Sequence, residues 1–210
     1  RALNLDKSPG PDGITNRMLT GGGDHFNELL HELLSSLWQY EIQPKAWELS
    51  LMQPIYKGDN KLKSDPASYR GIYLSSSIAK LFEGLILHRL TQYTEAHETL
   101  TENQLGTRPG RQTHDAIYAL LAIIQYNWIQ EQSPTYVAFL DFSTAYPSVH
   151  RSRLATMLYK VNIVGKMWHH LCARFNSARI RVLHPHIPPH QTLPVLRGLP
   201  EGSRLSPTLF

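Results

Sequence analysis

The most constraining feature of this sequence is an apolar run that ends on an acid. The run Tyr136-Val-Ala-Phe-Leu140 is followed at once by Asp141 and then by small and aromatic residues. Its length and its β-branched and aromatic character predict a buried strand, and a carboxylate at the end of such a strand must be solvated, paired or bound to a metal. Two interpretations stay open at this point: a metal ligand at a sheet edge, or a structural Asp that caps a turn.

The composition is that of a globular protein with a modest positive charge. The chain has 210 residues, 41% of them hydrophobic, and 21 Lys and Arg residues against 17 Asp and Glu residues. This length predicts one large domain or two closely joined subdomains, and the charge balance suits a polyanionic partner. The single cysteine, Cys172, rules out an internal disulfide and favours a reducing, intracellular compartment. No apolar run approaches the ~20 residues of a membrane span.

Apolar periodicity predicts helices joined by short extended segments. Helical spacing of apolar residues begins near residues 24, 76, 113, 154 and 167. Extended segments are predicted at 47–57, 69–74, 178–183 and 192–196, the last two as a hairpin. Pro54 interrupts the first of these segments, which predicts a position at a sheet edge.

Cations stand at the ends of two neighbouring extended segments. A hairpin formed by 47–57 and 69–74 would bring Lys57 and Arg70 together, and two fixed cations can grip a triphosphate, Arg as a planar fork and Lys as a point charge. The alternative is a pair of solvated surface cations.

Two loops have the composition of ligand-binding loops. Arg108-Pro-Gly-Arg111 is a turn with two arginines that could contact a phosphate backbone, although a plain basic loop is the alternative. In Gly198-Leu-Pro-Glu-Gly202 the glycines let the backbone approach a ligand closely, and a helix follows. A generic loop-to-helix turn remains the alternative for this second segment.

Taken together and in this order, these segments resemble the reverse transcriptase domain of non-LTR retrotransposons and, more distantly, of group II introns and retroviruses. The likeness covers nearly the whole chain. It is carried by Ser8-Pro-Gly-Pro-Asp-Gly-Ile14, Pro54-Ile-Tyr-Lys-Gly-Asp59, Ser68-Tyr-Arg-Gly-Ile-Tyr-Leu-Ser-Ser76, Gln104-Leu-Gly-Thr-Arg-Pro-Gly-Arg111, Phe139-Leu-Asp-Phe-Ser-Thr-Ala-Tyr146 and Gly198 to Phe210.

The resemblance implies an α+β fold, the fingers and partial palm of a right-hand polymerase, with helices packed on a small antiparallel sheet. Residues 1–133 would form the fingers region with an N-terminal extension, and residues 134–210 the partial palm. The implied partners are an RNA template, a DNA primer and deoxynucleoside triphosphates, without a membrane. The implied location is a retroelement ribonucleoprotein in the nucleus or cytoplasm.

The resemblance also implies a role for particular residues. Asp141, with the backbone carbonyl of Phe142, would ligate Mg²⁺, or Mn²⁺ in its place, in a two-metal nucleotidyl transfer. Lys57 and Arg70 would grip the incoming triphosphate. Tyr146 would exclude a 2′-hydroxyl by steric bulk.

The remaining implied contacts lie on the two loops. Glu201 and Gly202 would shape the nucleotide pocket, and Gly198 and Pro200 would contact the nucleic acid. Arg108 and Arg111 would contact it as well, from the loop between fingers and palm.

Departures from the family pattern are also informative. Position 201 is Glu where Gln is most frequent, which places an anion near the nucleotide, and position 147 is Pro where many relatives have Asp. Gly71 and Thr107 replace a Pro and a Phe. The family's paired Asp-Asp hairpin would follow the last segment, beyond residue 210, together with the rest of the palm and the thumb.

One carboxylate cannot hold two metals, so these residues alone are predicted to be inactive as a polymerase. Two alternative functions stay open. One is a non-catalytic remnant that binds nucleic acid, and the other is an α/β interaction module whose motif matches arise by chance.

Overall fold

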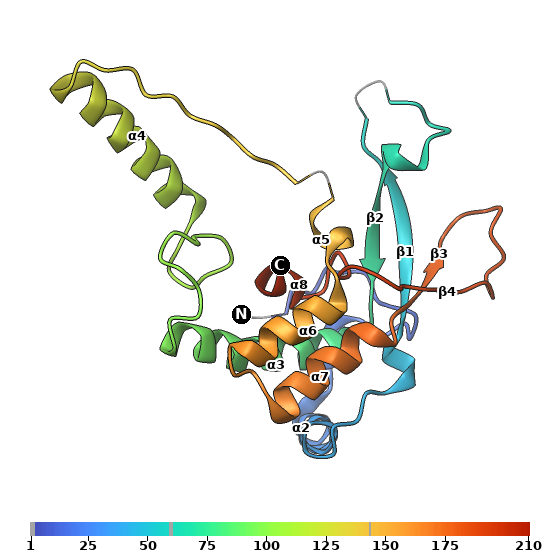
Figure 1. Ribbon diagram of the computed structural model, residues 1–210. Coiled ribbons are helices and arrows are strands. Elements are labelled where there is room, and N and C mark those ends of the chain that lie inside the picture. The colour runs from blue at the N-terminus through green and yellow to red at the C-terminus, as the bar shows by residue number, and fades with distance from the viewer. Residues whose placement is uncertain (1–2, 59–60, 143) are drawn as a thin grey trace. The chain divides into compact units, whose positions relative to one another are not determined.

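The chain forms two compact units in a computed structural model that describes residues 3–58, 61–142 and 144–210. The first unit comprises Arg1–His88 and Tyr146–Phe210, and the second comprises Arg89–Ala145 (Figure 1). Asp59 and Ser143, which belong to the segments quoted above, lie outside the described residues. The division into fingers at 1–133 and palm at 134–210 stays a prediction, because the two units are defined by internal packing and not by function.

A four-stranded sheet in the order β2-β1-β3-β4 organises the first unit. Its strands are β1 (Leu49–Tyr56), β2 (Tyr69–Leu74), β3 (Arg179–Val182) and β4 (Leu193–Pro194). The antiparallel pairs β1–β2 and β3–β4 confirm both predicted hairpins. The α+β class is confirmed too, although β1 and β3 pair in parallel, which the predicted antiparallel sheet did not include.

The predicted edge position of the first strand is wrong for the strand as a whole. β1 lies between β2 and β3 and pairs with β3 through Leu49–Met52. Pro54 lies past that stretch, where β1 pairs only with β2. The missing N–H of Pro54 therefore faces a side of β1 that has no paired strand at this point.

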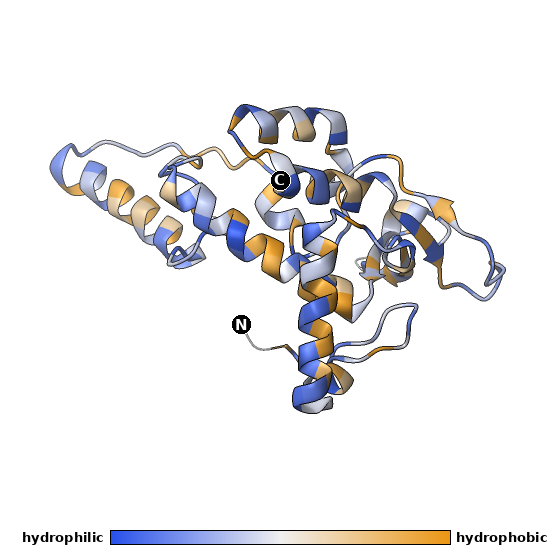
Figure 2. Cartoon of the chain, turned by 90° about the horizontal axis from the view of Figure 1, so that it is seen from below, coloured by the Kyte–Doolittle hydropathy of each residue, from blue (hydrophilic) through white to orange (hydrophobic). Residues whose placement is uncertain are grey.

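The predicted helices of the first unit are confirmed as α2 (Gly23–Gln39), α3 (Ser77–Ala96, which runs into the second unit), α6 (Arg151–Lys160) and α7 (Gly165–Asn176). Shorter helical turns complete the set: α1 (Asn16–Gly21), η1 (Lys45–Trp47), η2 (Pro66–Ser68), α5 (Ala145–Ser148) and α8 (Ser206–Leu209). α7 packs against α2 and α6. Figure 2 shows hydrophobic and hydrophilic residues alternating along α2, as expected for a helix with one face toward the core.

The core of the first unit gathers apolar side chains from η1, α3, α7 and the segment before α8. Each of these side chains is almost completely removed from solvent: Trp47, Phe82, Ile86, Leu171, Phe175 and Leu205. Burying such side chains is the main stabilising contribution to a unit of this size.

The second unit contains α4 (Thr113–Gln130), which confirms the helix predicted from residue 113. A capping box between Gln112 and Asp115 fixes its start. None of the described residues of α4 is buried, and Trp128 is 70% exposed. Of the described helices, α4 included, none combines the length and the apolarity that crossing a membrane requires.

The buried strand predicted before Asp141 is wrong. The described residues from 134 to 142 are extended but belong to no strand, and Leu140 is 95% exposed. Every strand pair among the described residues joins β1, β2, β3 and β4, so no strand of the described sheet pairs with this run. Apolar periodicity reports what a segment prefers, whereas a strand also needs a neighbour.

Candidate nucleotide and nucleic-acid site

The β1–β2 hairpin places the two predicted triphosphate-binding cations on one face. Arg70 lies opposite Ile55 in the register, and the Lys57 N–H donates to the Ser68 carbonyl at 2.9 Å, which extends the pairing by one step. Side chains of paired residues, and of residues two apart, share a face, so those of Lys57 and Arg70 lie on the same side. Both residues are exposed, and Lys57 Nζ donates to the Ala67 carbonyl at 2.8 Å.

The loop Gly198–Gly202, here called the nucleotide loop, is held at its start by α5. Leu199 N–H donates to the Tyr146 carbonyl at 2.9 Å, and Gly198 N–H donates to the Val149 carbonyl at 3.0 Å. Gly198 has φ +81°, and a Cβ at this position would stand 2.7 Å from the Pro147 Cα. Only glycine fits at this position, which explains why the loop begins with Gly198.

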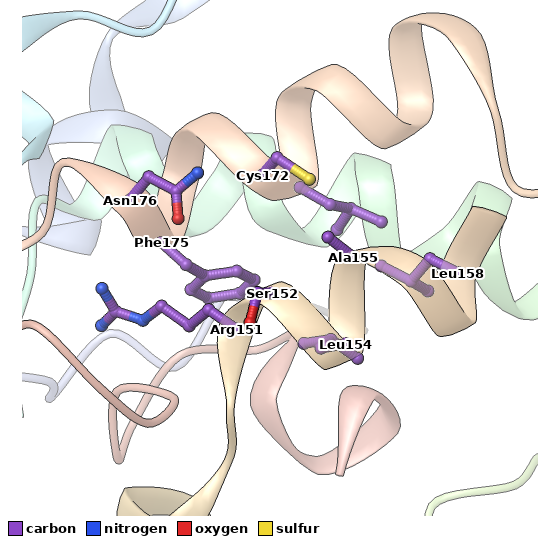
Figure 3. Close-up of a pocket in the computed structure, with 9 residues that line it drawn as sticks. Arg151, Ser152, Leu154, Ala155, Leu158, Cys172, Phe175 and Asn176 are labelled. Carbon is purple, nitrogen blue, oxygen red and sulfur yellow. The ribbon is translucent and has the colours of Figure 1, made fainter.

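Arg151, which the sequence did not single out, anchors the same end of the nucleotide loop. Its Nε donates to the Gly198 carbonyl at 2.8 Å and its Nη1 to the Val195 carbonyl. Burial lowers the pKa of the Arg151 guanidinium. Figure 3 shows Arg151 on α6 at the edge of a cavity of about 160 Å³ between α6 and α7. The Cys172 thiol lines this cavity, and burial raises its pKa, which disfavours the reactive thiolate.

The far end of the nucleotide loop lies against β2. Gly202 has φ +97°, and a Cβ there would stand 3.2 Å from the Tyr73 carbonyl oxygen. Burial raises the pKa of the Tyr73 phenol, and the Glu201 carboxylate raises it further. Pro200 turns the loop back, since its carbonyl accepts from the Ser206 hydroxyl at 2.8 Å. The structure therefore brings Tyr146 and the predicted loop residues together at one end of the sheet.

A basic cavity of about 440 Å³ opens beside Gly202. Its lining includes the cations Lys7, Lys80 and Arg204, together with residues of β2. Burial lowers the pKa of Lys80; Glu83 opposes this shift, whereas Lys7, Arg174 and Arg204 add to it. Asp6 also lines the cavity, and it forms an ion pair with Arg17 at 2.7 Å. Positive charge concentrated in a concave surface favours phosphate groups.

Local motifs could not reveal this cavity, because its cations come from distant parts of the chain. Lys7 lies in the N-terminal segment, Lys80 on α3 and Arg204 after the nucleotide loop. Only the fold brings their charges to one place.

Glu83 on α3 is a buried carboxylate beneath the nucleotide loop. Its Oε1 accepts from Arg174 Nε at 2.7 Å, and the two side chains are 2% and 5% exposed, respectively. Its Oε2 accepts from the Ser203 hydroxyl and from the Arg204 N–H, each at 3.0 Å. The sequence carried one signal for this role: an acid between Phe82 and Ile86 on a face otherwise predicted to be apolar.

Asp141 and Phe142 lie in the exposed extended segment of the second unit. Carboxylate and carbonyl oxygens are hard donors of the kind that Mg²⁺ prefers, so the donor set of these two residues fits the predicted metal. The described residues contain no group of three His, Cys, Asp or Glu side chains arranged to hold a metal. Because each unit is described by itself, the joint geometry of Asp141 and the nucleotide loop stays a prediction.

The two predicted arginines of the loop before α4 differ in what they contact. Arg108 forms a bidentate pair with Glu95 at 3.0 and 2.8 Å, and its Nη1 donates to the Thr101 carbonyl at 2.9 Å. Its side chain is 7% exposed, whereas that of Arg111, which pairs with Glu102 at 2.7 Å, is 39% exposed. The hydrogen bond from Arg108 lowers the pKa of Glu95. Arg111 is thus the more accessible of the two to a phosphate.

Residues 57–210 match the family described as reverse transcriptase (RNA-dependent DNA polymerase). The chain belongs to this family. The match includes Lys57, Arg70, Asp141, Tyr146 and the nucleotide loop, whereas the N-terminal segment Ser8–Ile14 lies before it.

The chain is also similar to proteins of insect mobile elements. It is 29% identical over 215 residues to a probable RNA-directed DNA polymerase from transposon BS of Drosophila melanogaster, covering 100% of this chain and 23% of that protein. It is 27% identical over 212 residues to the RNA-directed DNA polymerase from mobile element jockey of the same species, covering 99% and 22%. A Pol polyprotein from the type-1 retrotransposable element R1 of Bradysia coprophila is 30% identical over 116 residues, covering 55% and 12%. The chain therefore spans less than a quarter of these relatives.

Proposed function

We propose that this region supplies the fingers and the first part of the palm to an RNA-directed DNA polymerase of a non-LTR retroelement. The observation that carries the proposal is the nucleotide loop, hydrogen-bonded to Tyr146 at its start, lying close to Tyr73 at its end and bordered by the basic cavity. A loop whose backbone is exposed to a ligand, next to concentrated positive charge, suits a nucleoside triphosphate. Family membership and the names of the relatives support the same activity.

The catalytic metal would be held by Asp141 with the backbone carbonyl of Phe142. Bound Mg²⁺, or Mn²⁺, would stabilise the attacking 3′-oxygen and the leaving pyrophosphate of nucleotidyl transfer. The exposure of Asp141 leaves its oxygens accessible to a metal that arrives with the triphosphate. Further carboxylates would come from the polymerase that contains this region.

The substrate would be bound by charge and shape. Lys57 and Arg70 share one face of the hairpin and would grip the triphosphate, and Tyr146 would lie under the sugar. Gly198 and Pro200 would contact the nucleic acid, and Arg111 would contact a phosphate of its backbone. Base pairing with the RNA template would supply sequence specificity, and the DNA primer would supply the 3′-oxygen. An intracellular ribonucleoprotein, nuclear or cytoplasmic, is the setting that this activity requires.

A second function, nucleic-acid binding without catalysis, is favoured by Glu201. The Glu201 carboxylate lies next to Gly202 in the nucleotide loop, and its negative charge would repel the triphosphate of a nucleotide bound there. The basic cavity could still bind the phosphate backbone of a nucleic acid. The two functions differ in whether nucleotide binding needs a metal.

Metal-dependent nucleotide binding separates these functions. We expect the chain to bind a deoxynucleoside triphosphate in the presence of Mg²⁺, and we expect Asp141→Asn to weaken this binding by about tenfold or more. Asp24→Asn, at the exposed first turn of α2, is the matched control and should have no effect. Lys57→Ala and Arg70→Ala should weaken binding, whereas Lys160→Ala, at the last turn of α6, should not. Binding that is equally strong with and without Mg²⁺ would contradict the polymerase assignment and favour the second function.

A further inference from the structure

The Glu83 carboxylate accepts three hydrogen bonds in the interior of the first unit. Arg174 Nε donates to one oxygen, and the Ser203 hydroxyl and the Arg204 N–H both donate to the other. All of these partners are donors toward Glu83. An ionised carboxylate can accept from every one of them, whereas an amide offers a single acceptor oxygen and would aim its NH₂ group at another donor. The site is therefore built for a carboxylate.

Two of these donors directly follow the nucleotide loop. Ser203 comes immediately after Gly202, and the Ser203 Oγ also accepts from the Leu205 N–H at 3.2 Å. Leu205 has no exposed surface, so the chain beyond the loop is buried at this point. Glu83 thus fixes the loop at one end, while Tyr146 and Arg151 fix the other.

Arg204 provides a separate observation that places the end of the loop on α3. A Cβ added to Gly84 would stand 2.5 Å from Arg204 Nη1, so the guanidinium lies over the helix at the residue after Glu83. The same Arg204 lines the basic cavity next to Gly202. The carboxylate that holds the Arg204 backbone therefore also sets where this cation stands.

We propose that Glu83 is a positioning residue for nucleotide binding: from the protein interior it fixes the end of the nucleotide loop and the cation Arg204, without touching the substrate. This inference rests on the proposed function, because it assigns nucleotide binding to the loop. Arg174 orients Glu83 and supplies its countercharge, which a buried carboxylate needs. A loop that is already ordered before its ligand arrives binds that ligand without the entropic cost of ordering the loop on binding.

The test compares Glu83→Gln with wild type in the polymerase that contains this region, by steady-state primer extension at varied nucleotide concentration. We expect the KM for the nucleotide to rise about tenfold while kcat changes less than about twofold, since the variant loosens the loop and leaves the metal ligand in place. Glu28→Gln, an exposed glutamate on α2, is the matched control and should change neither constant.

Hydrogen exchange of the 210-residue chain gives a readout that does not depend on activity. The Arg204 and Leu205 amides should exchange faster in Glu83→Gln than in wild type, and equally fast in wild type and Glu28→Gln. If Glu83→Gln does not fold, Ser203→Ala removes only the hydroxyl and should show the same changes, whereas Ser203→Thr keeps the hydroxyl and should restore nucleotide KM.

The outcomes separate this inference from the proposed function. Faster exchange with an unchanged nucleotide KM would show that Glu83 stabilises the fold only, and unchanged exchange would show that it does not fix the loop; either result overturns the inference. A wild-type polymerase that incorporates no nucleotide would contradict the proposed function itself, and it would do so without any comparison to the Glu83 variant.

Discussion

At the scale of single residues, the head of the nucleotide loop depends on the absence of a side chain. Gly198→Ala combines two costs: a left-handed backbone at φ +81° and a Cβ placed 2.7 Å from the Pro147 Cα. Gly13→Ala has the first cost alone, because Gly13 has φ +70° and nothing within 4 Å of its added Cβ. We expect Gly13→Ala to lower the free energy of unfolding by about 1–2 kcal/mol, and Gly198→Ala by at least about 1 kcal/mol more.

Urea unfolding of the two glycine variants measures this difference. Equal losses for Gly198→Ala and Gly13→Ala would mean that the close approach to Pro147 is absent in solution, and with it the contact between α5 and the loop.

Tyr146 is predicted to discriminate against ribonucleotides. Its backbone carbonyl holds the nucleotide loop through the Leu199 N–H, and its ring packs edge-on against Phe210 at 5.7 Å. Tyr146→Ala keeps the carbonyl and removes the ring, so the loop should stay in place while space opens for a 2′-hydroxyl. We expect the preference for deoxynucleotides to fall by about tenfold or more, measured as the ratio of kcat/KM values for the two substrates. An unchanged ratio would remove Tyr146 from the sugar site.

At the scale of elements, the buried ion pair between Glu83 on α3 and Arg174 on α7 should be sensitive to the loss of one partner. Removing one residue of the pair should destabilise the fold more than removing both. Arg174→Met leaves Glu83 charged, buried and without its countercharge, which should lower the free energy of unfolding by about 3–5 kcal/mol. Adding Glu83→Leu removes the stranded charge and should recover much of this loss. Arg17→Met breaks an exposed pair with Asp6 and should cost less than about 1 kcal/mol. Losses that simply add in the double variant would contradict a direct coupling, and urea unfolding measures all of them.

The loop before α4 should depend on pH through Glu95. Hydrogen bonding to Arg108 lowers the pKa of Glu95 below its ordinary value of 4.5. A lowered folded-state pKa means that the pair contributes its full stability above pH 4.5 and loses it as the pH falls through the lowered pKa. Glu95→Gln should therefore melt at a lower temperature than wild type at pH 7, and the difference should shrink in acid. A difference that does not change with pH would show that the ion pair contributes nothing.

How much of this architecture could be predicted depends on the distance along the chain over which each contact forms. The helices α2, α3, α4, α6 and α7 and both hairpins follow from local periodicity. The parallel pairing of β1 with β3 joins residues about 130 positions apart, and no local pattern encodes it. The run ending at Leu140 is the opposite case. Its composition predicts a strand, but no strand among the described residues pairs with it.

At the scale of the whole molecule, the residues of the candidate site are likewise of two kinds. Some lie in short local motifs, and the others come together only through the fold. Asp141, Lys57, Arg70 and the nucleotide loop stand in short motifs, so the sequence could propose them and the family match supports their context. Glu83 with Arg174 and the cations of the basic cavity are brought together only by the fold. Functional residues that stand in short motifs can therefore be predicted from the sequence, whereas the interactions that position them cannot.

The proposal on which the others depend is that Asp141 is a catalytic metal ligand of an RNA-directed DNA polymerase. The most direct measurement is Mg²⁺-dependent primer extension on an RNA template by the polymerase that contains these residues, for wild type and Asp141→Asn at matched folding. We expect sustained deoxynucleotide incorporation by wild type and a loss of about 10³-fold or more in kcat for Asp141→Asn, with primer–template binding retained. Incorporation by Asp141→Asn at a rate close to that of wild type would contradict it.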